Sequence, residues 1–92
     1  MAEVITPEEI AVLSRKDTGH IHRLILHNDD VNTFPHVMNC LMVICKHTPV
    51  QAEQCAQIAH HNGRCEIKRG NYHTLEEMLV LLRENNVISE IQ

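Results

Sequence analysis

The chain contains no long apolar run, no cluster of basic residues and few aromatic rings. Its 92 residues include one Phe, one Tyr and no Trp. No apolar run approaches the roughly 20 residues that a membrane-spanning helix needs, so we expect no membrane partner. Eight Lys and Arg residues face twelve Asp and Glu residues, which gives a formal net charge of −4. This charge makes nucleic acid and anionic membranes unfavourable partners.

Features of secreted chains are also missing. Residues 1–9 contain acids but no basic segment, so they do not resemble a secretory signal, and we expect a cytoplasmic protein. No two of the four cysteines form a C-x-x-C pair, and Cys40, Cys45 and Cys55 fall within helical apolar patterns. Free cysteines are commonly buried, so we interpret these three as small core residues rather than as disulfide partners.

Catalytic and cofactor-binding motifs are absent from the sequence. It contains no G-x-S-x-G, no phosphate-binding loop and no dinucleotide fingerprint, and its only serines, Ser14 and Ser89, lie near the ends. We therefore expect no enzyme, no cofactor and no metal. Eight histidines leave one alternative open, a small metal-binding or redox-responsive protein. His36 and Cys40 are four residues apart on one predicted helix face. A structural zinc site, however, needs four converging ligands, and the usual local pairs are missing.

The length of the chain fits one small domain. Residues 1–20 have mixed charge, and we expect them to form a flexible N-terminal extension with a capping box between Thr6 and Glu9. Residues 21–92 form the predicted core domain. It opens with alternating apolar residues that predict a strand over residues 21–27.

Capping residues mark the predicted helices. Thr33 precedes the first helix, with Pro35 expected at its first position. Thr48 and Gln51 form a capping box for the second helix, which ends at Gly63. The remaining predicted elements are a strand over residues 64–69, a helix opened by a capping box of Thr74 and Glu77, and a terminal strand over residues 87–91. The order strand-helix-helix-strand-helix-strand predicts an α+β fold, with a small three-stranded antiparallel sheet packed on one face by three helices.

An acidic turn follows the first predicted strand. Residues 26–34 (LHNDDVNTF) run from an apolar strand into an amide, two adjacent carboxylates and the only Phe of the chain. Asn and Asp are common in turns because their side chains bond nearby backbone amides. Carboxylates beside Phe34 and Val37 also fit a small cation that carries an apolar group, such as a free protein N-terminus with a large first side chain. The residues alone leave both interpretations open.

The pattern resembles the ClpS family of Clp protease adaptors. The resemblance rests on residues 26–30 (LHNDD), on Val37 and Leu41 of the following helix, and on residues 60–63 (HHNG) at the end of the second helix. It covers residues 21–91. It implies an adaptor that binds proteins whose first residue is Leu, Phe, Tyr or Trp. The adaptor hands them to a ClpA- or ClpC-type AAA+ unfoldase for degradation by ClpP.

The resemblance also implies roles for individual residues. The residues that it assigns to N-degron binding are Asn28, Asp29, Asp30, Asn32, Phe34, Val37 and His60. Asn28, Asp29 and His60 would hold the α-amino group and the first peptide unit, and Asp30 would help to shape the loop. Phe34 takes the place of the usual Met gate, and a bulkier gate narrows the pocket.

The resemblance further concerns the protease partners. Glu76 or Glu77 would contact the unfoldase, and residues 1–20 would serve delivery, as the N-terminal segment does in the family. Ile88 is aligned with a pocket-lining Leu of the last strand. We expect a monomer. A degenerate ClpS-like domain, which binds the unfoldase or another partner without reading N-termini, is a third interpretation.

Overall fold

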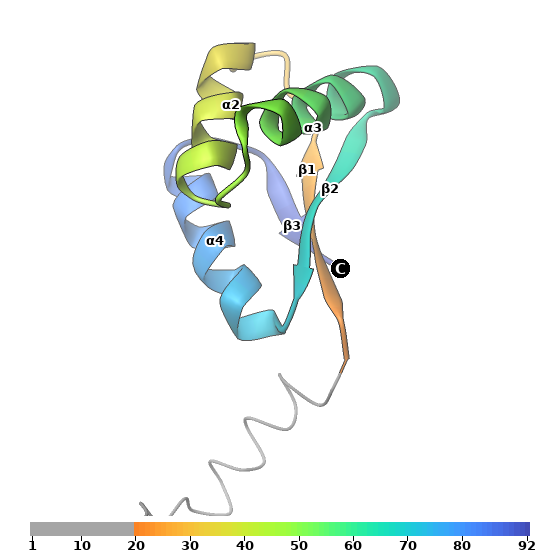
Figure 1. Ribbon diagram of the computed structural model, residues 1–92, viewed down its shortest axis with the longest axis vertical. Helices are drawn as coiled ribbons and strands as arrows, with labels where there is room; N and C mark the ends of the chain where they lie inside the picture. Colours follow the sequence, from red (N-terminus) through yellow and green to blue (C-terminus); the bar gives the residue numbers. More distant parts are fainter. Residues whose placement is uncertain (1–19) are drawn as a thin grey trace, which may run out of the picture.

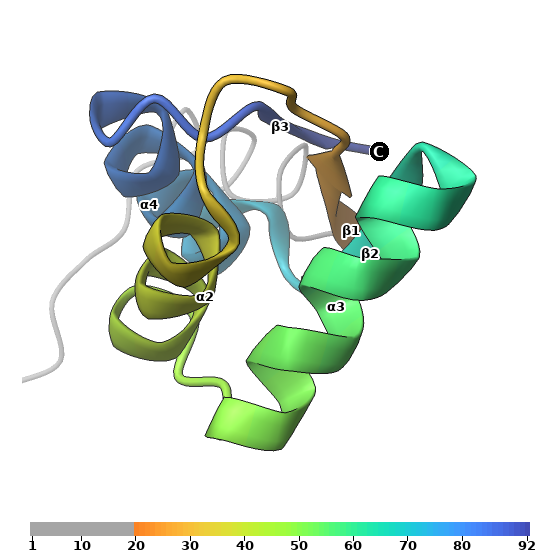
Figure 2. The ribbon, with the colours of Figure 1, turned by 90° about the horizontal axis from the view of Figure 1, so that it is seen from above.

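The structure is a computed structural model that describes residues 20–92. The expected extension over residues 1–20, with its capping box, therefore lies outside the described residues except for His20. The elements are β1 (His22–His27), α2 (Phe34–Val43), α3 (Pro49–Asn62), β2 (Arg64–Gly70), α4 (Tyr72–Glu84) and β3 (Ser89–Ile91). They confirm the predicted α+β fold, with three helices on one face of a three-stranded antiparallel sheet (Figure 1 and Figure 2). Within residues 20–92, no helix has the length and apolar character that crossing a membrane requires.

The central strand β1 places the apolar core. The sheet order is β2-β1-β3, with both pairs antiparallel. Leu24 and Leu26 of β1 are 0% and 2% exposed and pack with residues from all three helices. A register shift after Leu24 leaves Ile67 of β2 without a direct partner in the ladder, and Ile67 joins the same core. The helices therefore cover the sheet face that carries these three side chains.

Charged side chains cover the opposite face of the sheet. Glu66 Oε1 lies 3.3 Å from Arg23 Nε, and Glu90 Oε1 lies 2.7 Å from His27 Nε2. Between these pairs, Ile25 is only 3% exposed. Partly exposed contacts of this kind contribute little to stability, so the burial of Ile25 is the larger contribution on this face.

The start of α2 is set by Thr33. Its hydroxyl oxygen accepts a hydrogen bond from His36 N at 3.2 Å. Phe34 is the first helical residue, so Pro35 takes the second position and not the predicted first. Either position suits proline, because backbone N–H groups in the first turn have no partner within the helix.

The predicted limits of α3 are confirmed at both ends. Thr48 and Gln51 form the reciprocal capping box at its start. Gly63 ends it with φ 91°, a left-handed conformation that glycine adopts without a steric cost. This sharp reversal leads directly into β2 (Figure 1), which packs against α3.

The start predicted for α4 is wrong. Asn71 is its N-cap, because Asn71 Oδ1 accepts a hydrogen bond from Thr74 N at 2.8 Å. The helix therefore begins at Tyr72, and Thr74 lies inside it instead of pairing with Glu77 as a capping box.

The terminal strand is shorter than predicted. It covers Ser89–Ile91 rather than residues 87–91. Val87 is not part of the ladder because its N–H donates to Leu82 O, at the end of α4, at 2.9 Å. The side chain of Val87 is nevertheless 2% exposed and belongs to the core.

Candidate functional site

Asp29 closes the acidic loop, residues 28–33, which joins β1 to α2. Its Oδ1 accepts hydrogen bonds from Val31 N at 2.6 Å and Asn32 N at 3.2 Å, and its Oδ2 accepts one from the Asn32 side-chain amide. Asn28 Oδ1 accepts a further bond from Asp29 N at 2.9 Å. These contacts are those by which Asp and Asn stabilise turns, so the turn interpretation is confirmed for Asp29.

The same hydrogen bonds favour the ionised form of Asp29. Its pKa lies below the ordinary value of 3.8, chiefly because the Val31 N–H stabilises the carboxylate. Partial burial opposes this effect, and the two bonds from Asn32 reinforce it. The loop therefore holds a fixed negative charge at neutral pH.

Two contacts tie the acidic loop to distant parts of the chain. Asn28 N donates to Gly63 O at 2.9 Å, which joins the loop to the C-terminal end of α3. Asn32 Nδ2 donates to Asn86 O at 2.7 Å, in the turn between α4 and β3. Asn86 has φ 63°, which Asn tolerates better than most residues. The loop is thus held at both ends by segments that converge only in the folded chain.

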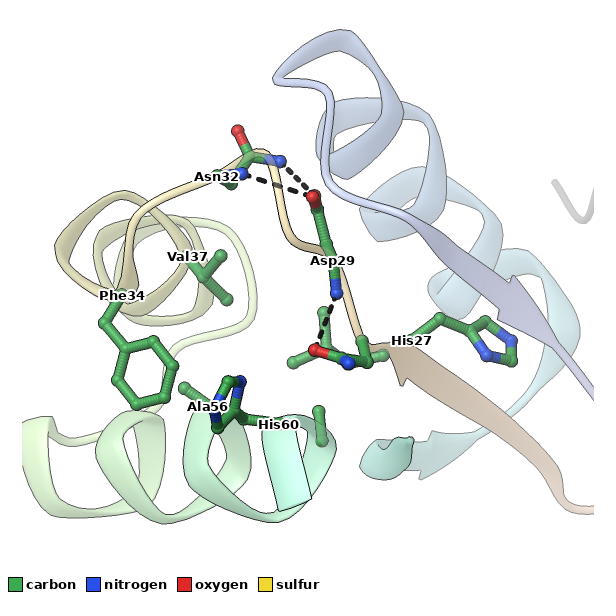
Figure 3. Close-up of a pocket in the computed structure, with 10 residues that line it drawn as sticks. His27, Asp29, Asn32, Phe34, Val37, Ala56 and His60 are labelled. Atoms are coloured by element: carbon green, nitrogen blue, oxygen red, sulfur yellow. Dashed lines mark hydrogen bonds between the residues drawn. The ribbon is translucent and has the colours of Figure 1, made fainter. Parts of the chain in front are cut away.

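Two aromatic rings face the acidic loop. Phe34 begins α2, and His60 lies in the last turn of α3. Their ring centroids are 5.4 Å apart with the planes at 82°, an edge-to-face contact. Figure 3 shows both rings across an open space from Asp29, with the Val37 side chain directed toward the same space.

A small cavity lies between the loop and these rings. Its lining residues are Leu26, His27, Asn28, Asp29, Asn32, Phe34, Val37, Ala56, Ala59 and His60. Six of the seven residues assigned to the site from the sequence thus surround one space. The exception is Asp30, which is exposed and does not line the cavity. The cavity volume is ≈ 20 Å³, room for about one water molecule.

Sequence reasoning misses four of the lining residues. Ala59 and His60 follow Ala56 by three and four residues, so each of them neighbours Ala56 on the surface of α3. That spacing could have identified both alanines. Leu26 and His27 directly precede the acidic loop, but the His27 ring points away from the cavity toward β3 (Figure 3).

Other residues assigned from the sequence lie outside the cavity. Glu76 and Glu77, the expected unfoldase contacts, lie on α4, where Glu77 Oε1 is 3.3 Å from His73 Nε2. Ile88 is 52% exposed and lines a separate surface hollow with Arg83 and residues of the turn between α4 and β3.

The metal interpretation finds no support in residues 20–92. Cys40 Sγ lies 3.8 Å from His36 Nε2, as the helical spacing predicts. The described part of the chain nevertheless contains no group of three or more His, Cys, Asp or Glu side chains that could hold a metal ion.

The cavity combines a polar edge with an apolar wall. The charge of Asp29 and the polar side chain of Asn28 lie on the loop side, and the His60 ring lies across from them on α3. On the other side, Ala56 and Ala59 are 4% and 3% exposed and belong to the core. The arrangement thus sets a negative charge beside apolar surface, in a space with room for about one water molecule.

The fold places the chain in a known class of small α+β domains. It matches the solved structure described as "The structure of Agrobacterium tumefaciens ClpS2 bound to L-phenylalaninamide", with a TM-score of 0.69 and 15% sequence identity, over 78% of this chain and 94% of that one. At this identity the likeness shows the fold alone. A family model described as "ATP-dependent Clp protease adaptor protein ClpS" matches residues 18–87. The chain therefore belongs to the ClpS family and is a Clp protease adaptor. No curated protein matches the sequence.

Proposed function

We propose that this adaptor recognises N-terminal degrons whose first residue is Leu, Phe, Tyr or Trp. Without catalytic activity of its own, it delivers these proteins to a ClpA- or ClpC-type AAA+ unfoldase for degradation by ClpP. The observation that supports this proposal is a single cavity that joins the charge of Asp29 to the apolar wall of α3. The ligand of the solved ClpS2 structure has matching chemistry, since L-phenylalaninamide carries an α-amino group beside an aromatic side chain.

The free N-terminus of a substrate supplies the cation. An α-amino group has a pKa near ~8, so it is mostly protonated at neutral pH. Asn28 and His60 can hydrogen-bond the ammonium or the first peptide unit, and such charge-assisted bonds are roughly twice as strong as neutral ones. The carboxylate of Asp29 already accepts bonds within the loop, so it attracts the ammonium mainly through its charge.

The first side chain of the substrate supplies the apolar group. Full burial of a large apolar side chain contributes about 1.5–3 kcal/mol. The cavity of ≈ 20 Å³ is too small for such a group, so the ligand must displace the Phe34 ring, which is 38% exposed. This movement breaks the contact between Phe34 and His60, so the ligand takes the place of the Phe34 ring beside His60. With the cost of association included, the contacts to the ammonium and the burial of the first side chain together correspond to micromolar binding.

A peptide titration tests the proposal. Fluorescent peptides that differ only in their first residue are titrated with the full chain. Peptides that begin with Leu, Phe, Tyr or Trp should bind at least about tenfold more tightly than those that begin with Ile, Val, Lys or Glu, a gap of about 1.4 kcal/mol. Equal affinity across the panel would instead favour an adaptor that binds the unfoldase, or another partner, without reading N-termini.

Delivery is tested separately by removing residues 1–20. These residues lack the apolar periodicity of a core segment, so the truncated chain should bind a Leu-initiated peptide within about twofold of the full chain. It should fail to accelerate degradation of a Leu-initiated substrate by the unfoldase and ClpP. Undiminished delivery by the truncated chain would assign that step to the core domain, where Glu76 and Glu77 are the proposed contacts.

A further inference from the structure

Two cysteines meet where α3 packs on β2, outside the candidate pocket. Cys55 of α3 and Cys65 of β2 line one groove of ≈ 240 Å³, together with His47, Ile58 and Ile67. The reversal at Gly63 brings them together, because it turns the chain from α3 into β2, which packs against α3. Both thiols are free.

The two thiols differ in exposure. Cys55 is 4% exposed, whereas Cys65 is partly exposed and its Sγ lies 3.5 Å from Glu66 O. The pKa of the Cys55 thiol is raised, chiefly by burial and further by a hydrogen bond with the Cys65 side chain. Both side chains line the same groove where α3 packs on β2, so the two thiols face one space. Cys65 is therefore the thiol that a small oxidant reaches first, and Cys55 is its protected neighbour.

We propose that Cys55 and Cys65 form a reversible disulfide when the protein meets hydrogen peroxide. The Cys65 thiolate attacks a peroxide oxygen; an S–O bond forms, the O–O bond breaks, and the departing hydroxide takes a proton to become water. The Cys55 sulfur then loses its proton and attacks the Cys65 sulfur. The S–S bond forms, the S–O bond breaks, and the second hydroxide leaves as water. Two thiols are oxidised by two electrons, and one peroxide is reduced to two waters.

The burial of Cys40 and Cys45 makes both thiols poor first targets for the oxidant. Cys45 is 0% exposed and Cys40 is 4% exposed, and both belong to the closed core. Burial raises the pKa of Cys45 to about 11, which leaves it little thiolate at neutral pH. The disulfide would link β2 to α3, the helix that also carries Ala56 and Ala59 of the pocket wall.

Peptide mapping after peroxide treatment tests this proposal. The full chain is treated with hydrogen peroxide, its remaining thiols are alkylated, and it is digested without reductant for mass spectrometry. The expected product is one linked pair of fragments that contain Cys55 and Cys65, lighter by two hydrogen atoms and separated by dithiothreitol. Cys40→Ala, which leaves the pair intact, should give the same product.

Two single substitutions, one at each thiol, test the proposal separately, so a folding defect in one variant does not decide the result. Cys65→Ser changes only the partly exposed partner and should abolish the linked fragments while Cys55 stays open to alkylation after denaturation. Cys55→Ala should leave a sulfenic acid on Cys65 that dimedone traps. The proposal is overturned if Cys65 of the unsubstituted chain is oxidised to sulfinic acid while Cys55 stays reduced. It is also overturned if Cys65 forms a disulfide between two copies of the chain, or if neither thiol reacts.

Discussion

The two walls of the candidate pocket are built in different ways. The acidic loop is polar, exposed or half-buried, and closed by hydrogen bonds between near neighbours such as Asp29 and Val31. The α3 wall is apolar and buried, with Ala56 and Ala59 packed into the core of the domain. One backbone hydrogen bond, from Asn28 N to Gly63 O, joins the loop to the end of the helix.

This difference teaches that affinity can change without stability at the loop, whereas the two change together at the α3 wall. The loop brings the charge that a cationic ligand would meet, and its side chains lie at the surface, so many changes there spare the core. The α3 wall fills the pocket and the core at once, so a change of volume there alters ligand binding and the free energy of unfolding together.

Asp29→Asn should have the largest effect, a loss of peptide binding. The amide retains one oxygen that can accept the bonds from Val31 and Asn32, but it removes the charge. Binding of a Leu-initiated peptide should weaken by about 2–5 kcal/mol because the ammonium loses its counter-charge. Stability should fall by only about 0.5–1.5 kcal/mol, for the lost bond from the Asn32 side chain. Calorimetric titration and thermal melts measure the two quantities.

Asp30→Asn is the matched control for that variant. It removes the same charge from the next residue, which is exposed and does not line the cavity. Both binding and stability should change by less than about 0.5 kcal/mol. If the two substitutions weaken binding equally, the ligand responds to the net charge of the loop and not to a specific contact with Asp29.

The next effect is expected from Ala59→Leu on the opposite wall. The added atoms exceed the cavity, so the variant should be less stable by about 1–3 kcal/mol and should bind a Leu-initiated peptide at least tenfold more weakly. Gln57→Leu, at an exposed position of the same helix, should change neither property appreciably. Chemical denaturation and peptide titration measure both. An Ala59→Leu protein with full stability would show that the α3 wall is not packed as described.

A smaller effect is expected from Phe34→Ala at the mouth of the cavity. Loss of the edge-to-face contact with His60 should cost about 0.5–1.5 kcal/mol of stability at most. The wider opening should admit β-branched side chains, so the preference for Leu over Val should fall by roughly threefold or more. Competition titrations with the two peptides measure this ratio. An unchanged preference would mean that residues other than Phe34 set the size limit.

The smallest expected effect is on the pH dependence of stability. The pKa of Asp29 is lowered in the folded chain, so this group contributes stability that is present above its ordinary pKa of 3.8 and is lost as the pH falls through the lower folded value. The difference in melting temperature between the unsubstituted chain and Asp29→Asn should therefore shrink on going from about pH 6 to about pH 3. A difference that grows in acid would show that the loop bonds do not favour the carboxylate.

The parts that could be predicted from the sequence are those fixed by local chemistry. Thr33, Thr48 and Gly63 act through partners within a few residues, so their side-chain types indicate helix limits directly. The order of strands and helices follows from those limits. Asp29 was predictable as a turn residue for the same reason, and its bonds to Val31 and Asn32 confirm it.

The parts that could not be predicted depend on competition or on distant contacts. Asn71 and Thr74 are both good N-cap residues, and only the folded chain shows that Asn71 takes the position. Alanine has no chemical signature of a site, so Ala56 and Ala59 enter the pocket only through the packing of α3 against the loop. The proximity of Cys55 to Cys65 likewise depends on how β2 packs against α3.

The measurement that tests the proposed pocket most directly compares one Leu-initiated peptide with a free and with an acetylated N-terminus. Acetylation removes the cation and leaves the apolar side chain unchanged. The full chain should bind the acetylated peptide at least about tenfold more weakly, whereas Asp29→Asn, which lacks the counter-charge, should show a much smaller ratio. Equal affinity of the full chain for the two peptides would contradict recognition of a free N-terminus by Asn28, Asp29 and His60.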